Sequence, residues 1–62
     1  MNTVEIIPKD GMGKHAMIYD VEEYYCTEKM FYARQASGIV SYVSLDLIMV
    51  IRVTPDEETN NE

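Results

Sequence analysis

The chain has 62 residues, of which 47% are hydrophobic and 26% are charged, and its formal net charge at pH 7 is −6. This length allows one domain with a small core, and the hydrophobic fraction excludes a chain that is disordered throughout. We expect residues 1–55 to form a single compact domain and the acidic residues 56–62 to form a disordered tail.

The compartment is indicated by three sequence features. Cys26 is the only cysteine, which excludes an internal disulfide and favours a reducing environment. No apolar run approaches the roughly 20 residues that cross a bilayer, and the first residues lack the basic and apolar regions of a signal peptide. We therefore expect a soluble, cytoplasmic protein, in the host cytoplasm if a phage encodes it.

The first predicted unit is a β-hairpin over residues 3–20. Residues 3–7 are mostly β-branched or aliphatic, and Pro8 is expected to end this strand. Residues 9–14 contain the Asp10-Gly11 pair and a second glycine, which favour a turn because these residues tolerate positive φ. The segment 15–20 then returns as an antiparallel strand.

Capping signals predict a helix over residues 21–36. Asp20 followed by Glu23 matches a capping box, in which two side chains satisfy free backbone donors at a helix start. Arg34 suits the last turn and Gly38 suits the left-handed position after it. An alternative stays open, because the tyrosines and phenylalanine of this segment favour strands and residues 27–29 could be the tip of a second hairpin.

Residues 39–53 are expected to form one bent strand or two short ones. Val40 and Tyr42 alternate with Ser41 and Val43, and residues 44–46 interrupt the pattern. The predicted fold class is thus α+β, with a small antiparallel sheet in ββαβ or ββαββ order and one helix on one face. The alternative is a small all-β barrel.

Five consecutive aliphatic residues, 47–51, indicate a strand that is apolar on both faces. Alternation would turn Leu47, Met49 and Ile51 one way and the other two residues the opposite way. One helix covers only one face, so the other needs a second copy, a foreign protein or a further part of this chain. A homodimer is one of these outcomes, and its candidate interface consists of Ile48, Val50 and Arg52.

No catalytic, metal-binding or cofactor-binding pattern is recognisable. The only histidine, His15, would have to be the base of any catalytic triad, and its neighbours suggest no such arrangement; paired Cys and His residues for a zinc site are also lacking. The five basic residues are scattered among eleven acidic ones, which disfavours nucleic acid. We expect a protein that is not an enzyme and that holds no cofactor or metal.

Carboxylates interleaved with tyrosines make the segment from 20 onward the candidate partner-binding site, since tyrosine is enriched at interface hot spots. Its residues are Asp20, Glu22, Glu23, Tyr24, Tyr25, Glu28 and Tyr32. We expect this site to bind a protein partner. On that partner, the site contacts a basic, nucleic-acid-binding surface.

Size and acidity give the chain a general resemblance to small inhibitors that bacteriophages and mobile elements use against host defence or replication proteins. This resemblance implies an inhibitor or adaptor function. One alternative is an assembly protein that self-associates through the strand that is apolar on both faces. Another is a small single-stranded nucleic-acid binder, which only the tyrosines support.

Overall fold

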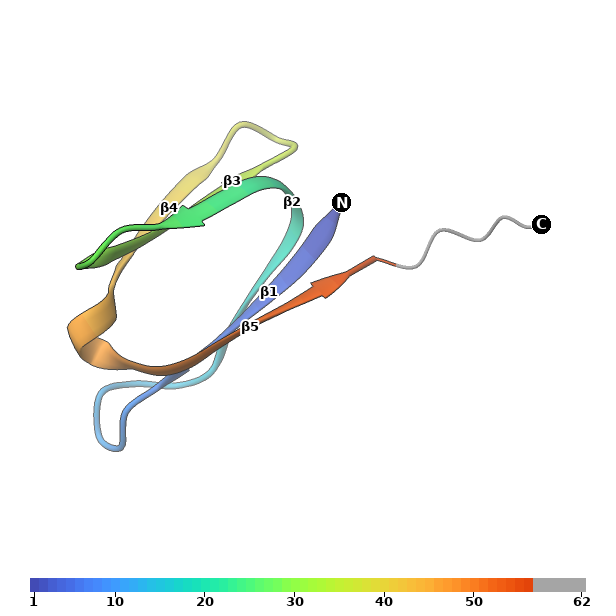
Figure 1. Ribbon diagram of the computed structural model, residues 1–62. Coiled ribbons are helices and arrows are strands. Elements are labelled where there is room, and N and C mark those ends of the chain that lie inside the picture. Colours follow the sequence, from blue (N-terminus) through green and yellow to red (C-terminus); the bar gives the residue numbers. More distant parts are fainter. Residues whose placement is uncertain (57–62) are drawn as a thin grey trace.

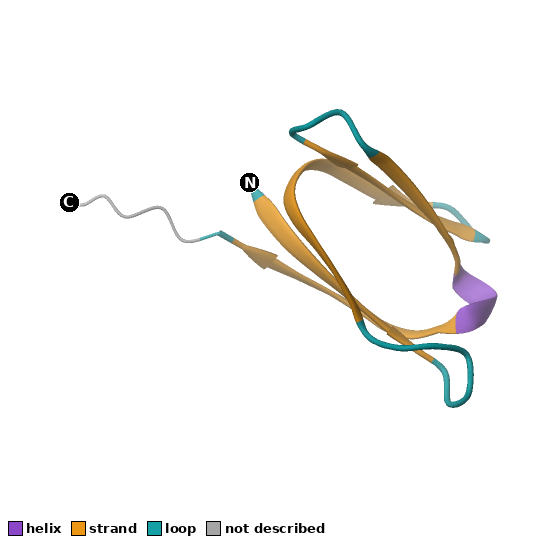
Figure 2. Cartoon of the chain, turned by 180° about the vertical axis from the view of Figure 1, so that it is seen from behind, coloured by secondary structure: helices purple, strands orange, loops and turns teal. Residues whose placement is uncertain are grey.

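Five antiparallel strands and one 3-10 turn make up the computed structural model, which describes residues 1–56 (Figure 1). The elements in chain order are β1 (Asn2–Pro8), β2 (Ala16–Cys26), β3 (Met30–Gln35), β4 (Val40–Ser44), the 3-10 turn Leu45–Leu47 and β5 (Ile48–Pro55). They form one sheet in the order β4-β3-β2-β1-β5. The sheet curls strongly, so that β3 and β4 lie across from β1 and β5 (Figure 1); Figure 2 shows the same curl from behind.

The predicted helix over residues 21–36 is wrong, and with it the α+β fold class: the described residues are all-β, as in the alternative. This segment contains the second half of β2, a turn and β3. Thr27 makes the turn, because its Oγ1 accepts hydrogen bonds from the backbone N–H groups of Lys29 and Met30. Strand propensity of the aromatic residues and pairing with neighbouring strands outweigh the local capping signals.

Both residues of the expected capping box have other roles. Asp20 has a φ of 54° in the middle of β2, where it bends the strand, and the backbone N–H of Ala36 donates to its carbonyl oxygen over 2.8 Å. Glu23 pairs with Arg34 on β3. The register of β2 shifts against β1 and against β3 on either side of this bend, so that one strand serves both halves of the curled sheet.

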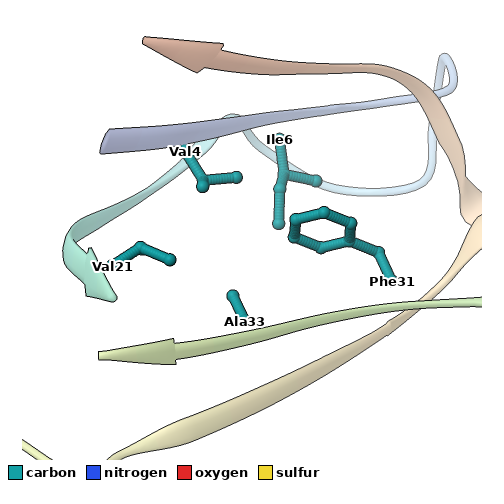
Figure 3. Packing of buried hydrophobic residues seen from close by; sticks show 5 residues of the cluster. All are labelled: Val4, Ile6, Val21, Phe31 and Ala33. Carbon is teal, nitrogen blue, oxygen red and sulfur yellow. The ribbon is translucent and has the colours of Figure 1, made fainter. Parts of the chain in front are cut away.

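The core lies between these two halves (Figure 3). Its five buried side chains point toward one another, and they are Val4, Ile6, Val21, Phe31 and Ala33. Partly buried aliphatic side chains from β2, β4, β5 and the 3-10 turn complete it. Full burial of a large apolar side chain contributes about 1.5 to 3 kcal/mol, so a core this small leaves little reserve against truncation.

The hairpin over residues 3–20 and the strand end at Pro8 are confirmed, and the interruption expected at residues 44–46 is the 3-10 turn Leu45–Leu47, one residue later. The predicted facing of residues 47–51 is wrong. In the pairing with β1, Ile7 is opposite Val50 and Pro8 is opposite Ile48, so Met49 is an extra residue in a β-bulge. The bulge turns Ile48 toward the core and leaves Met49 and Val50 exposed on the outer face.

The start of the predicted acidic tail is held by β1. Asp56 Oδ1 accepts a hydrogen bond from Thr3 Oγ1 over 2.7 Å, and the Asp56 backbone N–H donates to the carbonyl oxygen of Met1. The rest of that prediction, residues 57–62, lies outside the described residues. Within residues 1–56, no helix is long and apolar enough to cross a membrane.

Candidate functional site

Three tyrosines lie side by side on the outer face of β2, β3 and β4. Phe31 and Ala33 of β3 point into the core, so Tyr32 between them points outward. The strand register places Tyr25 opposite Tyr32 and Tyr32 opposite Tyr42. We call these three residues the tyrosine row.

The rings of the row are in contact. The centroids of Tyr25 and Tyr32 are 4.5 Å apart with the rings stacked at 22°, and those of Tyr32 and Tyr42 are 5.4 Å apart with the rings at 70°. Both distances fall in the range in which aromatic pairs attract. Each tyrosine therefore restricts its neighbour, and less side-chain entropy remains to be lost when the row binds a partner.

The row is open to solvent. Tyr25 is 52% exposed and Tyr42 is 66% exposed, while Tyr32 is half-buried between them. Val40, the first residue of β4, lies on the same face as Tyr42 and is also exposed. This outer face thus presents a cluster of large apolar and aromatic side chains, and exposed clusters of this kind often mark interaction sites.

Charged side chains border one side of the row. Arg34 follows Tyr32 on the same face of β3, and its Nη2 lies 3.2 Å from Glu23 Oε1 and 3.7 Å from Glu22 Oε1. Two carboxylates against one guanidinium leave a net charge of −1 in this group. The three side chains are between 42% and 54% exposed, so solvent screens the ion pairs and they contribute little to stability.

The structure brings together some of the predicted site residues and separates others. Tyr25, Tyr32, Glu22 and Glu23 share the region described above. Tyr24 pairs with Ala33 on the core-facing side of the sheet, and its ring centroid is 6.3 Å from that of Phe31.

The two remaining predicted residues lie apart from the row. Asp20 is at the bend of β2, and Glu28 is in the turn between β2 and β3. Sequence reasoning missed Tyr42 and Arg34 as site residues. The alternation of residues 40–43 already put Val40 and Tyr42 on one face, but only the pairing of β4 with β3 shows which face that is.

The outer face of β1 and β5 has a different character. Glu5 Oε1 accepts a hydrogen bond from Arg52 Nη1 over 3.2 Å, and Glu5 Oε2 lies 3.4 Å from His15 Nδ1. Of the predicted oligomer interface, Val50 and Arg52 lie on the outer side of β5, whereas Ile48 packs against the core. These three residues therefore do not form one surface.

Other types of site receive no support from the geometry. No pocket opens in the part of the chain that the structure describes. Across the same residues, no three side chains of the metal-ligating types come together. Cys26 is free and exposed at the end of β2.

Comparisons of the chain with protein-family models, with curated proteins and with solved structures found no match.

Proposed function

We propose that this protein is a small acidic protein-binding module, an inhibitor or adaptor of the kind used by phages and mobile elements. It docks on a basic, nucleic-acid-binding surface of a host protein. The observation that carries the proposal is the tyrosine row, exposed and bordered by the carboxylates of Glu22 and Glu23. The free thiol of Cys26 fits action in a reducing cytoplasm.

Tyrosine suits such a surface for a physical reason. Its ring supplies a large apolar contact area, its hydroxyl remains able to form a hydrogen bond, and few torsions are lost on binding. In the row, the two contacts with Tyr32 already limit the orientations of Tyr25 and Tyr42. A partner surface that excludes water from these rings gains the apolar contribution at low entropic cost.

The acidic character selects the kind of partner. The net charge of −6 repels phosphate and attracts a surface rich in lysine and arginine. Basic surfaces of this kind are common on proteins that bind nucleic acid, since neutralising phosphates requires clustered positive charge. A small acidic module bound there occludes the surface, which is how an inhibitor acts.

Replacing both Tyr25 and Tyr42 with alanine is expected to reduce capture of the target by about 10- to 100-fold, the loss typical of two moderate interface hot spots. Both side chains are more than half exposed, so the fold is expected to remain. The measurement uses the full chain, immobilised and exposed to lysate of the native cell, with quantitative mass spectrometry of the retained proteins.

Tyr19→Ala is the matched control, because Tyr19 is 57% exposed on β2 and lies outside the row. A target is a protein that the wild type and this control retain and the double variant loses. Added duplex DNA and rising salt should both release it. The proposal is contradicted if the double variant retains the same proteins as the wild type. It is also contradicted if neither DNA nor salt reduces the amount of target that the wild type retains.

One observation favours a second candidate function, the binding of single-stranded nucleic acid. Exposed, mutually stacked tyrosines resemble the platforms on which successive bases stack. Against it, the cation that borders the row, Arg34, is already engaged by two carboxylates. Fluorescence anisotropy with labelled short DNA and RNA strands at low salt measures this binding. Non-specific binding is detectable at about 100 µM protein, so an unchanged anisotropy at that concentration excludes this function.

A further inference from the structure

The sheet has two edges, and they differ in how well they are protected. β5 contains Arg52, ends at Pro55 and has the bulge at Met49. Charge, proline and bulges are the devices by which natural edge strands avoid pairing with other chains. β4, the other edge, has none of them: its sequence is VSYVS, and its register with β3 runs without a shift.

β4 is also the only strand of the described sheet without a charged residue. β1 contains Glu5, β3 contains Arg34 and β5 contains Arg52. β2 contains three charged residues, Asp20, Glu22 and Glu23. The edge that is straight and unprotected is therefore also the uncharged one.

The hydrogen-bond pattern shows which backbone groups of β4 are free. The Gln35 N–H donates to the carbonyl oxygen of Ile39, and the Leu45 N–H donates to that of Lys29. Because hydrogen-bonded pairs alternate with non-bonded pairs along an antiparallel ladder, the bonded pairs between these ends are Phe31 with Val43 and Ala33 with Ser41.

It follows that the N–H and C=O groups of Val40, Tyr42 and Ser44 point away from β3 toward the open edge. The side chains of the same three residues lie on the outer face, where Tyr42 closes the tyrosine row. The open edge and the end of the row therefore coincide at Tyr42.

We propose that a second copy of this chain pairs with β4 in antiparallel fashion, with Tyr42 opposite Tyr42 of the other copy. In this register Val40 is opposite Ser44, and all the free backbone groups of the three residues find partners. The two sheets become one continuous sheet, and the two tyrosine rows meet at the two-fold axis.

Symmetry identifies the occupant as a second copy, because the free backbone groups of β4 are centred on Tyr42 and are their own complement in the antiparallel register. Two molecules that each carry a net charge of −6 repel one another, and contact is least unfavourable along the one strand that has no charge. Antiparallel pairing of identical strands is two-fold symmetric, so the association closes at a dimer and consumes the unprotected edge.

The contact is short, since β4 has five residues. Interfaces at the small end of the range are weak, and the expected dissociation constant is on the order of 100 µM. The dimer presents two tyrosine rows side by side, which increases the avidity for an extended or repeated target surface.

The test measures mass in solution as a function of concentration. Light scattering coupled to size exclusion, and sedimentation equilibrium, should show the 7.2 kDa monomer at about 10 µM and a shift toward twice that mass at about 1 mM, on either side of the expected dissociation constant. Higher salt should strengthen the dimer, because it screens the repulsion between the copies. This salt response is opposite to the one expected for the basic target.

Two variants locate the interface. Tyr42→Lys places like charges directly opposite one another across the two-fold axis, and Ser44→Pro removes a free N–H at a residue whose φ of −74° already suits proline. Each is expected to weaken dimerisation by at least about 10-fold, whereas Tyr19→Lys, at a similarly exposed tyrosine, leaves it unchanged.

Amide hydrogen exchange tests the wild type without any substitution. The Val40 and Tyr42 amides should become protected as concentration rises, while exposed amides in the turn at residues 10–14 should not. A wild type that remains monomeric at 1 mM overturns the proposal, as does protection of β4 that appears only when a foreign target is added. Dimerisation that survives Ser44→Pro, or that Tyr19→Lys weakens equally, also overturns it.

Discussion

Replacement of Phe31 by alanine is expected to leave the protein largely unfolded at 25 °C. Phe31 is 3% exposed and is the largest of the five buried side chains. Truncation of a buried phenylalanine costs about 3 to 5 kcal/mol, while the single core of a domain of this length rarely supplies more than about 3 to 5 kcal/mol of net stability. The measurement is urea denaturation followed by circular dichroism, with loss of the folded baseline as the expected result.

Two further variants make this result specific. Phe31→Leu keeps most of the apolar volume and should remain folded, with a loss below about 2 kcal/mol. Tyr19→Ala removes an exposed ring of similar size and should change stability by no more than about 0.5 kcal/mol. A folded Phe31→Ala with a loss below 1 kcal/mol would show that the two halves of the sheet are not held together by this core.

Replacement of Asp20 by valine should destabilise the fold by about 2 kcal/mol, although the side chain is exposed. Asp20 has a φ of 54°, a conformation that aspartate and asparagine tolerate and that a β-branched residue strongly disfavours. The strain acts at the bend of β2, on which both halves of the sheet depend. Chemical denaturation gives the change in the free energy of unfolding directly.

The controls at this position separate backbone conformation from side-chain chemistry. Asp20→Asn should be nearly neutral, and Asp20→Gly should be neutral or stabilising by up to about 1 kcal/mol, because glycine adopts positive φ without steric cost. Equal losses in Asp20→Val and Asp20→Gly would show that the carboxylate is what matters and that the bend does not depend on φ.

The candidate site was predictable in composition and only partly in geometry. The sequence identified the carboxylate and tyrosine segment after residue 20, and Tyr25, Tyr32 and Glu23 indeed lie in one region. As a helix, however, the segment would have placed Tyr24 and Tyr25 on one stripe. In a strand, neighbouring side chains face opposite sides, so Tyr24 packs beside Phe31 and Tyr25 joins the row.

The error at the predicted helix has a physical origin. An acid followed three residues later by a glutamate satisfies a capping pattern, and a glycine with positive φ suits both a helix end and a tight turn between strands. In the structure both residues have positive φ, Asp20 inside β2 and Gly38 in the turn between β3 and β4. Local signals of this kind are ambiguous, and long-range strand pairing resolves them.

What the sequence by itself determined is local: the first hairpin, the strand end at Pro8 and the break before β5, because turn residues and proline act on the backbone within a few positions. Only the tertiary structure decided the curl of the sheet, the facing of β5 and the assembly of the tyrosine row. The bulge at Met49 depends on the pairing of β5 with β1, which lie at opposite ends of the chain, and one inserted residue reverses which side chains face the core.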